Sequence, residues 1–211
     1  MGLSGEGKVE DSVWIVKTHY PERIGRVKFH SNKCIVIVRN PLDAIFSLFN
    51  MIGTMTHNES LSAEVLDKAM HHSSLWTDFI HQESEVWDEF HRFWLRLASA
   101  GSENDFPVHF ITYEALSTDP EPALTDLFKF LLDAESLEGT TIAAKIKQVC
   151  SVTSAASEGQ SKQVYKPRSG KINKNLQFYD GAQLEHLYTR CREQIHRFGY
   201  QEFFVAAGVV V

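Results

Sequence analysis

The sequence predicts an α/β fold in which a mainly parallel sheet is flanked by helices. Short runs of β-branched and aromatic residues recur along the chain, and stretches with helical periodicity separate them. These runs show no polar alternation, which is typical of strands buried on both faces of a parallel sheet. Because strands alternate with helices, we expect a layered domain built on one sheet.

Three apolar runs predict the strands of this sheet. They are VWIVK at 13–17, KCIVIVR at 33–39 and VHFITY at 108–113. Each is short, as strands are, and each is rich in the residues that favour extended backbone.

The clearest helix start follows the second strand, in NPLDAIFSLFNMI. Asn40 is a natural N-cap, Pro41 suits the first helical position, and Asp43 places a negative charge in the first turn. Apolar spacing and capping residues predict further helices at 63–99 (one or two), 117–132, 139–150 and 180–197. The polar stretch 151–175 is expected to be a loop.

Composition limits the classes of function. The 211 residues suit one domain, 1–211, and a net charge of −6 argues against a nucleic-acid partner. The three cysteines form no CxxC pair, so neither a disulfide framework nor a zinc site is indicated. No apolar stretch is long enough to cross a bilayer, so we expect a soluble chain with a buried C-terminal tail.

Charged and polar residues stand where each predicted strand ends. The three ends carry Lys17–His19, Arg39–Asn40 and Tyr113–Glu114. In open α/β sheets, ligands bind beyond the carboxyl ends of the strands. A helix start with free N–H groups beside an arginine attracts anions. The pattern therefore predicts a phosphate-like ligand at this edge of the sheet.

Four motifs resemble those of the sulfotransferase superfamily, nearest the sulfotransferase-domain proteins related to WSC-domain sulfotransferases. VWIVKTHYP is similar to the family's K-T-H-x-P strand end, and VIVRNPLDAIFSLF to its 3′-phosphate motif. VHFITYEALSTDPEPALTDLFKFL resembles the strand and helix that follow, and YKPRSGKINK resembles the late R-x-G loop. The resemblance covers about 13–200 and implies a P-loop NTPase-like sulfotransferase fold.

The resemblance implies transfer of a sulfuryl group from 3′-phosphoadenosine 5′-phosphosulfate to a hydroxyl or amine acceptor. His19 is then the general base that takes the acceptor's proton. Lys17 points to the same side of its strand and neutralises the phosphosulfate or the bridging oxygen. Cationic side chains serve this chemistry, so no metal is expected.

The family's nucleotide contacts map onto five positions. Arg39 grips the 3′-phosphate, and Arg168 and Gly170 close over it from the late loop. Tyr113 contacts the adenine. Ser47 also belongs to the 3′-phosphate motif, although eight residues of helix rise about 12 Å, so its assignment depends on the resemblance.

One family motif is missing from the chain. Family members have an earlier strand and a loop like P-x-S-G-[NT] that cradles the 5′-phosphosulfate, and residues 1–12 supply neither. We therefore expect a sheet without its first strand, in an N-terminally truncated chain whose 3′-phosphate half is intact. Two outcomes stay open: a working sulfotransferase and a non-catalytic nucleotide-binding remnant of the same fold.

Other classes of function fit less well. A P-loop kinase relative is disfavoured because G-x-x-x-x-G-K-[ST] does not occur, and the ten histidines lack ligand spacing. A small-molecule or glycan acceptor is expected near 50–95, but its identity cannot be read. The compartment, cytoplasm or Golgi lumen, is equally open, because a lost N-terminus could have carried an anchor.

Overall fold

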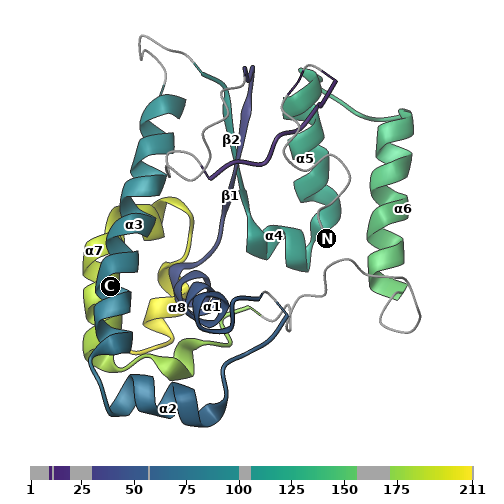
Figure 1. Cartoon of the computed structure of the whole chain (residues 1–211). Helices are drawn as coiled ribbons and strands as arrows, with labels where there is room; N and C mark the ends of the chain where they lie inside the picture. The colour runs from purple at the N-terminus through teal and green to yellow at the C-terminus, as the bar shows by residue number, and fades with distance from the viewer. Residues whose placement is uncertain are drawn as a thin grey trace.

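A pair of parallel strands lies between two groups of helices (Figure 1). The computed structural model describes residues 10, 12–19, 30–56, 58–99, 106–155 and 172–210. Strand β1 (Cys34–Val38) pairs with β2 (Val108–Thr112), with Cys34 opposite Val108 and Val38 opposite Thr112. Two of the three expected strands, and their parallel pairing, are therefore confirmed.

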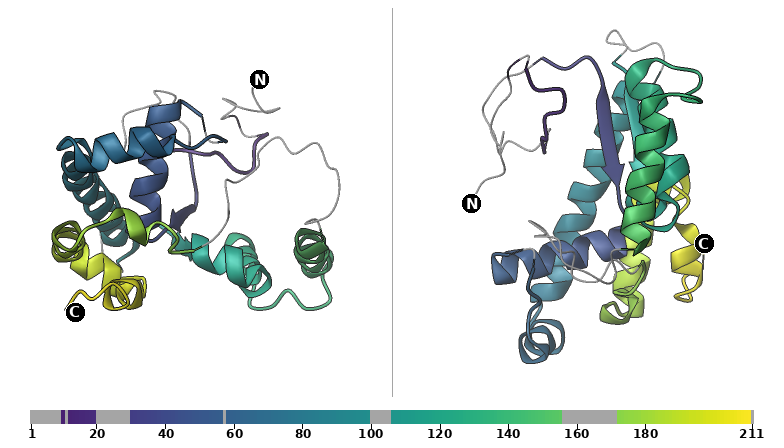
Figure 2. Two further views of the ribbon diagram at one scale, coloured as in Figure 1. Left: turned by 90° about the horizontal axis from the view of Figure 1, so that it is seen from below. Right: turned by 90° about the vertical axis from the view of Figure 1, so that its right-hand side faces the viewer.

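The other elements of the described chain are helical. They are α1 (Pro41–Thr54), α2 (Ala63–His71), α3 (Leu75–Ala98), α4 (Tyr113–Thr118), α5 (Pro120–Leu132), α6 (Thr141–Ala155), the 3-10 turn η2 (Leu176–Phe178), α7 (Gly181–Arg197) and α8 (Gln201–Val205). Helices α3 and α7 run side by side on one side of the strands, and α5 and α6 stand on the other (Figure 2). The helices and the parallel strand pair are consistent with the expected α/β sulfotransferase fold.

The main hydrophobic core lies where β1, α1, α3 and α7 meet. Its most deeply buried side chains include Val38, Leu42, Ile80, Leu187 and Phe204, which expose no surface. A second, smaller cluster lies between α5 and α6 and is built around Leu137, Ile146 and Cys150. The core that positions the end of β1 is therefore the one shared with α1, α3 and α7.

Helix α1 begins as its sequence predicts. The backbone N–H of Asp43 donates to Oδ1 of Asn40 at 2.9 Å, and Pro41 occupies the first helical position. The helix ends at Met55, whose left-handed backbone (φ 55°) stops the chain from continuing. Local sequence signals therefore account for the start of this helix.

The strand expected at 13–17 does not form. Residues 12–19 carry no strand, and the side chains of Trp14 and Ile15 are 65% and 57% exposed. Strand propensity yields a strand only when a neighbouring strand supplies hydrogen-bond partners, and β1 pairs only with β2 in the described chain. The Trp14 ring instead lies 6.2 Å from that of Phe128 on α5.

The start and the end of helix α6 also differ from the prediction. The helix expected at 139–150 runs from Thr141 to Ala155, so its last turn includes residues assigned to the loop.

No helix among the described residues is long and apolar enough to span a membrane.

Phe204 packs the C-terminal tail against the core, although most of the described residues after it are exposed, and this yields a first prediction. Phe204 on α8 is fully buried, whereas its neighbour Val205 is 51% exposed. Replacing Phe204 by Ala should lower the free energy of unfolding by about 3–5 kcal/mol, because the lost ring leaves a cavity. Val205→Ala, the control, should change it by less than about 0.5 kcal/mol. Urea denaturation measures both, and equal losses would contradict this assignment of the core.

Candidate functional site

The site lies where β1 ends and α1 begins. Arg39 is half-buried and follows the last residue of the strand, and Asn40 caps the helix with no exposed surface. The positive end of the α1 dipole therefore lies beside an arginine. Four other parts of the chain contact this turn or the residues that hold it, and their contacts decide how Arg39 is presented.

The side chain of Arg39 stacks on an aromatic ring. Its guanidinium carbon lies 4.4 Å from the ring centroid of Tyr113. Its Nε is buried and has no hydrogen-bond partner, and no ion pair joins this guanidinium to a carboxylate within the described ranges. A buried N–H without a partner is costly in a native protein. Arg39 thus keeps unused hydrogen-bonding capacity for an anion.

Tyr113 reaches Arg39 from the first turn of α4. The sequence predicts Tyr113 as the end of a strand, but it is the first residue of a helix, which Thr112 caps by accepting from Ala115 N–H at 3.1 Å. The cap turns the chain at the end of β2. Because β1 and β2 are parallel, Arg39 and Tyr113 stand at the same edge of the sheet.

Glu114 holds the backbone next to Arg39. Its Oε1 accepts from the backbone N–H of Asn40 at 3.0 Å and from its Nδ2 at 2.7 Å. Its Oε2 accepts from the hydroxyl of Tyr200 at 2.8 Å. Burial raises the pKa of Tyr200, and the neighbouring Glu114 carboxylate raises it further. Tyr200 therefore remains a neutral donor to Glu114.

Helix α3 holds the same turn from another side. The indole Nε1 of Trp87 donates to the carbonyl oxygen of Arg39 at 3.1 Å. One turn later, Nδ1 of the buried His91 lies 2.6 Å from the carbonyl oxygen of Trp87. Burial lowers the pKa of His91 to about 4, against the upward effects of that hydrogen bond and of Asp88. His91 is therefore neutral near pH 7 and donates to Trp87.

Asp43 joins the first turn of α1 to a segment 130 residues further along the chain. Its carboxylate accepts from the backbone N–H of Asn173 at 2.6 Å and from Nδ2 of Asn175 at 2.7 Å. Tyr179 adds a hydrogen bond from its hydroxyl to the carbonyl oxygen of Leu42 at 2.8 Å. The segment 172–179 is thus fastened along the start of α1.

Three other predicted site residues fall within the described chain. Ser47 is half-buried on α1, and Lys17 and His19 are exposed in the 12–19 segment, outside any strand. Arg168 and Gly170 lie outside the described residues. Of the predicted residues, the structure therefore brings Arg39 and Tyr113 into contact.

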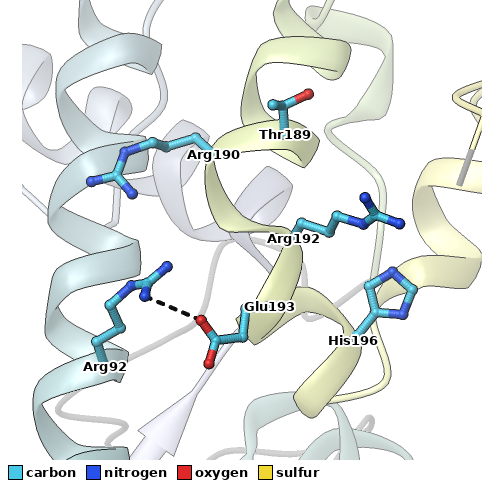
Figure 3. Close-up of a pocket in the computed structure, with 6 residues that line it drawn as sticks. All are labelled: Arg92, Thr189, Arg190, Arg192, Glu193 and His196. Atoms are coloured by element: carbon cyan, nitrogen blue, oxygen red, sulfur yellow. Dashed lines mark ion pairs between the residues drawn. The ribbon is translucent and has the colours of Figure 1, made fainter.

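A pocket of about 520 Å³ between α3 and α7 is rich in arginine, but two of its three arginines are paired with carboxylates (Figure 3). Arg92 pairs with Glu193 at 3.1 Å and with Asp88 at 3.0 Å. Arg190 also pairs with Asp88, and it lies 4.0 Å from Glu89. Carboxylates already neutralise the two paired arginines, so this pocket is a poorer anion site than the turn at Arg39. The described residues also contain no metal-binding group of His, Cys, Asp and Glu.

Sequence reasoning missed several residues of the site. Trp87 and Tyr200 lie in helical or tail patterns that predict core packing, and their hydrogen bonds depend on tertiary contacts. Asp43 carries a local signal as a residue of the first helical turn, but its partners Asn173 and Asn175 carry only a weak one. The signal for these two partners is a pair of asparagines two residues apart in a polar loop.

Comparison with known proteins adds one finding. Residues 7–199 match the model of the family described as the sulfotransferase domain. No curated protein and no solved structure matches the chain significantly. The matched range covers most of the chain and contains the whole cluster around Arg39 except Tyr200.

The neutral state of His91 predicts a pH effect on stability. The unfolded imidazole takes a proton at its ordinary pKa of 6.5, whereas the folded one does so only at about 4. The unfolded state thus binds more protons between these values. The free energy of unfolding should fall by roughly 3 kcal/mol as pH drops across that window.

Denaturant titrations at several pH values measure this effect. In His91→Phe the fall between pH 6.5 and 4 should be smaller by that amount. His71→Phe, which changes an exposed histidine of α2, should keep the slope of the parent chain. An unchanged slope in His91→Phe would contradict the neutral, buried assignment.

Proposed function

This chain belongs to the sulfotransferase family, and from that premise we propose that it binds 3′-phosphoadenosine 5′-phosphosulfate at Arg39. The proposed reaction moves the sulfuryl group of this donor to a hydroxyl or amine of a small-molecule or glycan acceptor. The proposed nucleotide product is 3′-phosphoadenosine 5′-phosphate.

One observation carries the proposal: the half-buried Arg39 has a buried Nε without a partner and stacks on Tyr113. A guanidinium binds phosphate through parallel N–H donors, and these bonds are stronger than neutral ones. The N-terminus of α1 adds backbone dipoles of the same sign. The carboxylates nearby, Asp43 and Glu114, are occupied as acceptors of N–H and O–H groups.

The remaining assignments follow the family pattern. We propose that Ser47, Arg168 and Gly170 complete the 3′-phosphate site and that Tyr113 borders the adenine. The ring of Tyr113 has one face on the guanidinium of Arg39. A base near this pair would then lie close to the phosphate that Arg39 binds.

The proposed chemistry is an in-line displacement at sulfur. The acceptor oxygen or nitrogen forms the new bond to sulfur while the bond from sulfur to the bridging phosphate oxygen breaks. His19 takes the proton of the acceptor, and Lys17 stabilises the charge that develops on the leaving phosphate. Both side chains are exposed.

The acceptor's place is proposed from exposed apolar side chains at the end of α1. Ile52 is 49% exposed and Met55 is 86% exposed. Small-molecule sites are lined mainly by apolar side chains with a few polar groups. We therefore place the acceptor along the 50–95 region.

Nucleotide binding can be tested by thermal stability with 3′-phosphoadenosine 5′-phosphate. At a hundredfold excess over its Kd, the nucleotide should stabilise the parent chain by about 2.7 kcal/mol. Arg39→Ala should remove most of this gain, because the phosphate loses its guanidinium. Arg96→Ala, which removes an exposed arginine of α3, should retain it. A parent chain that shows no gain would refute the proposed site.

The role of His19 can be separated from binding. His19→Ala should lower the rate of sulfuryl transfer by about 10²–10⁴-fold, the usual contribution of a general base, while the Kd for the nucleotide stays unchanged. His30→Ala, another exposed histidine, should keep the parent rate. If the parent chain binds the nucleotide but transfers no sulfate to any acceptor, the chain is a binding protein on the same fold.

A further inference from the structure

The carboxylate of Asp43 is buried at the start of α1, with 1% of its surface exposed. Its Oδ2 accepts from Nδ2 of Asn40 at 3.1 Å and from the backbone N–H of Asn173 at 2.6 Å. Its Oδ1 accepts from the backbone N–H of Asn175 at 3.3 Å and from its Nδ2 at 2.7 Å. In the part of the chain that the structure describes, N–H donors rather than a cation meet this buried charge.

This arrangement goes beyond capping the helix. The capping bond runs from Asp43 N–H to Oδ1 of Asn40, and it leaves the carboxylate of Asp43 unused. The carboxylate instead gathers donors from the 172–175 turn, where Asn173 has a left-handed backbone (φ 53°). Asparagine adopts that conformation more readily than most residues. Both backbone amides thereby point at one carboxylate.

The carboxylate of Asp43 also accepts a hydrogen bond from Asn40, the residue next to Arg39. Nδ2 of Asn40 is held between Asp43 and Glu114, and the backbone N–H of Asn40 is held by Glu114. Asn40 therefore has little freedom, and the backbone of Arg39 is fixed from its C-terminal side. Trp87 holds the carbonyl of Arg39 as well.

We propose that Asp43 is a positioning residue of the nucleotide site, an inference that rests on the proposed function. Asp43 sets the 172–175 turn against the start of α1 and keeps Arg39 aimed at the 3′-phosphate. Its own negative charge opposes phosphate binding, but its four N–H donors offset that charge. The positioning effect outweighs the repulsion.

The direction in which the nucleotide Kd changes separates the positioning effect of Asp43 from its charge repulsion. Asp43→Asn removes the charge and turns one acceptor into a donor, so it loosens the 172–175 turn. If positioning dominates, the Kd for 3′-phosphoadenosine 5′-phosphate should rise by roughly tenfold or more, which is the loss expected for a charge-assisted hydrogen bond. If repulsion dominates, the Kd should fall.

A swapped pair tests whether the contact itself matters. In Asp43→Asn combined with Asn175→Asp, an amide again faces a carboxylate across the same gap. We expect the Kd to return toward the parent value, to within about threefold. Asn175→Ala removes the side-chain donor without changing Asp43, so it should weaken binding in the same direction even if Asp43→Asn does not fold.

A matched control separates positioning from general stability. Asp180 is also an aspartate at the start of a helix, but its carboxylate caps α7 by accepting from Gln183 N–H at 2.8 Å. Asp180→Asn should lower the melting temperature but leave the Kd unchanged. Hydrogen exchange adds a readout without ligand: in Asp43→Asn the amides of Asn173 and Asn175 should exchange faster, while those in the middle of α7 should not.

Calorimetric titration on the full chain decides the outcome. If the parent does not bind the nucleotide, or binds it as tightly in Arg39→Ala, the proposed function fails. If the parent binds through Arg39 but folded Asp43→Asn and Asn175→Ala bind equally well or more tightly, only the positioning role of Asp43 is overturned. Weaker binding in both variants, with recovery in the swapped pair, supports it.

Discussion

The structure depends on the burial of a polar helix start. The first turn of α1 is packed into the main core, although Asn40 and Asp43 are polar and expose 1% of their surface or less. Buried polar groups are tolerated only when their hydrogen bonds are satisfied. The start of α1 can therefore be buried only if partners arrive from elsewhere, and α3, α4, the 172–179 segment and Tyr200 supply them.

This requirement explains why hydrogen bonds hold the surroundings of Arg39 while Arg39 itself is not fully satisfied. Glu114 and Trp87 fix its neighbour and its carbonyl, yet its Nε has no partner. Stacking on Tyr113 offsets part of that cost, because cation–π contacts contribute about 0.5–2 kcal/mol depending on burial. An unsatisfied group inside an otherwise satisfied network is typical of a position selected for binding rather than for stability. In a chain of the sulfotransferase family, that position coincides with the expected phosphate contact.

The α3–α7 pair shows the opposite use of arginine. Asp88 is fully buried there and is contacted by both Arg92 and Arg190, so its charge is paired inside the helix interface. These arginines fasten two helices and have little capacity left for a ligand. Judged by its number of arginines alone, this surface would be a better candidate anion site than the turn at Arg39. The partners of each cation reverse that ranking, because an unpaired guanidinium binds anions and a paired one must first give up its carboxylate.

Local sequence signals by themselves determined the start of α1, the positions of β1 and β2 and most of the helices, because caps, periodicity and β-branched runs act over a few residues. The family could also be read from short motifs, since their residue types serve the same chemistry wherever they stand. Only the tertiary structure decided that 13–17 is no strand, because a strand needs a paired neighbour. It also decided that Tyr113 begins a helix and that Asp43 meets Asn173 and Asn175. Hydrogen bonds across 130 residues leave no trace in local spacing, so the chain must fold before these residues share a site.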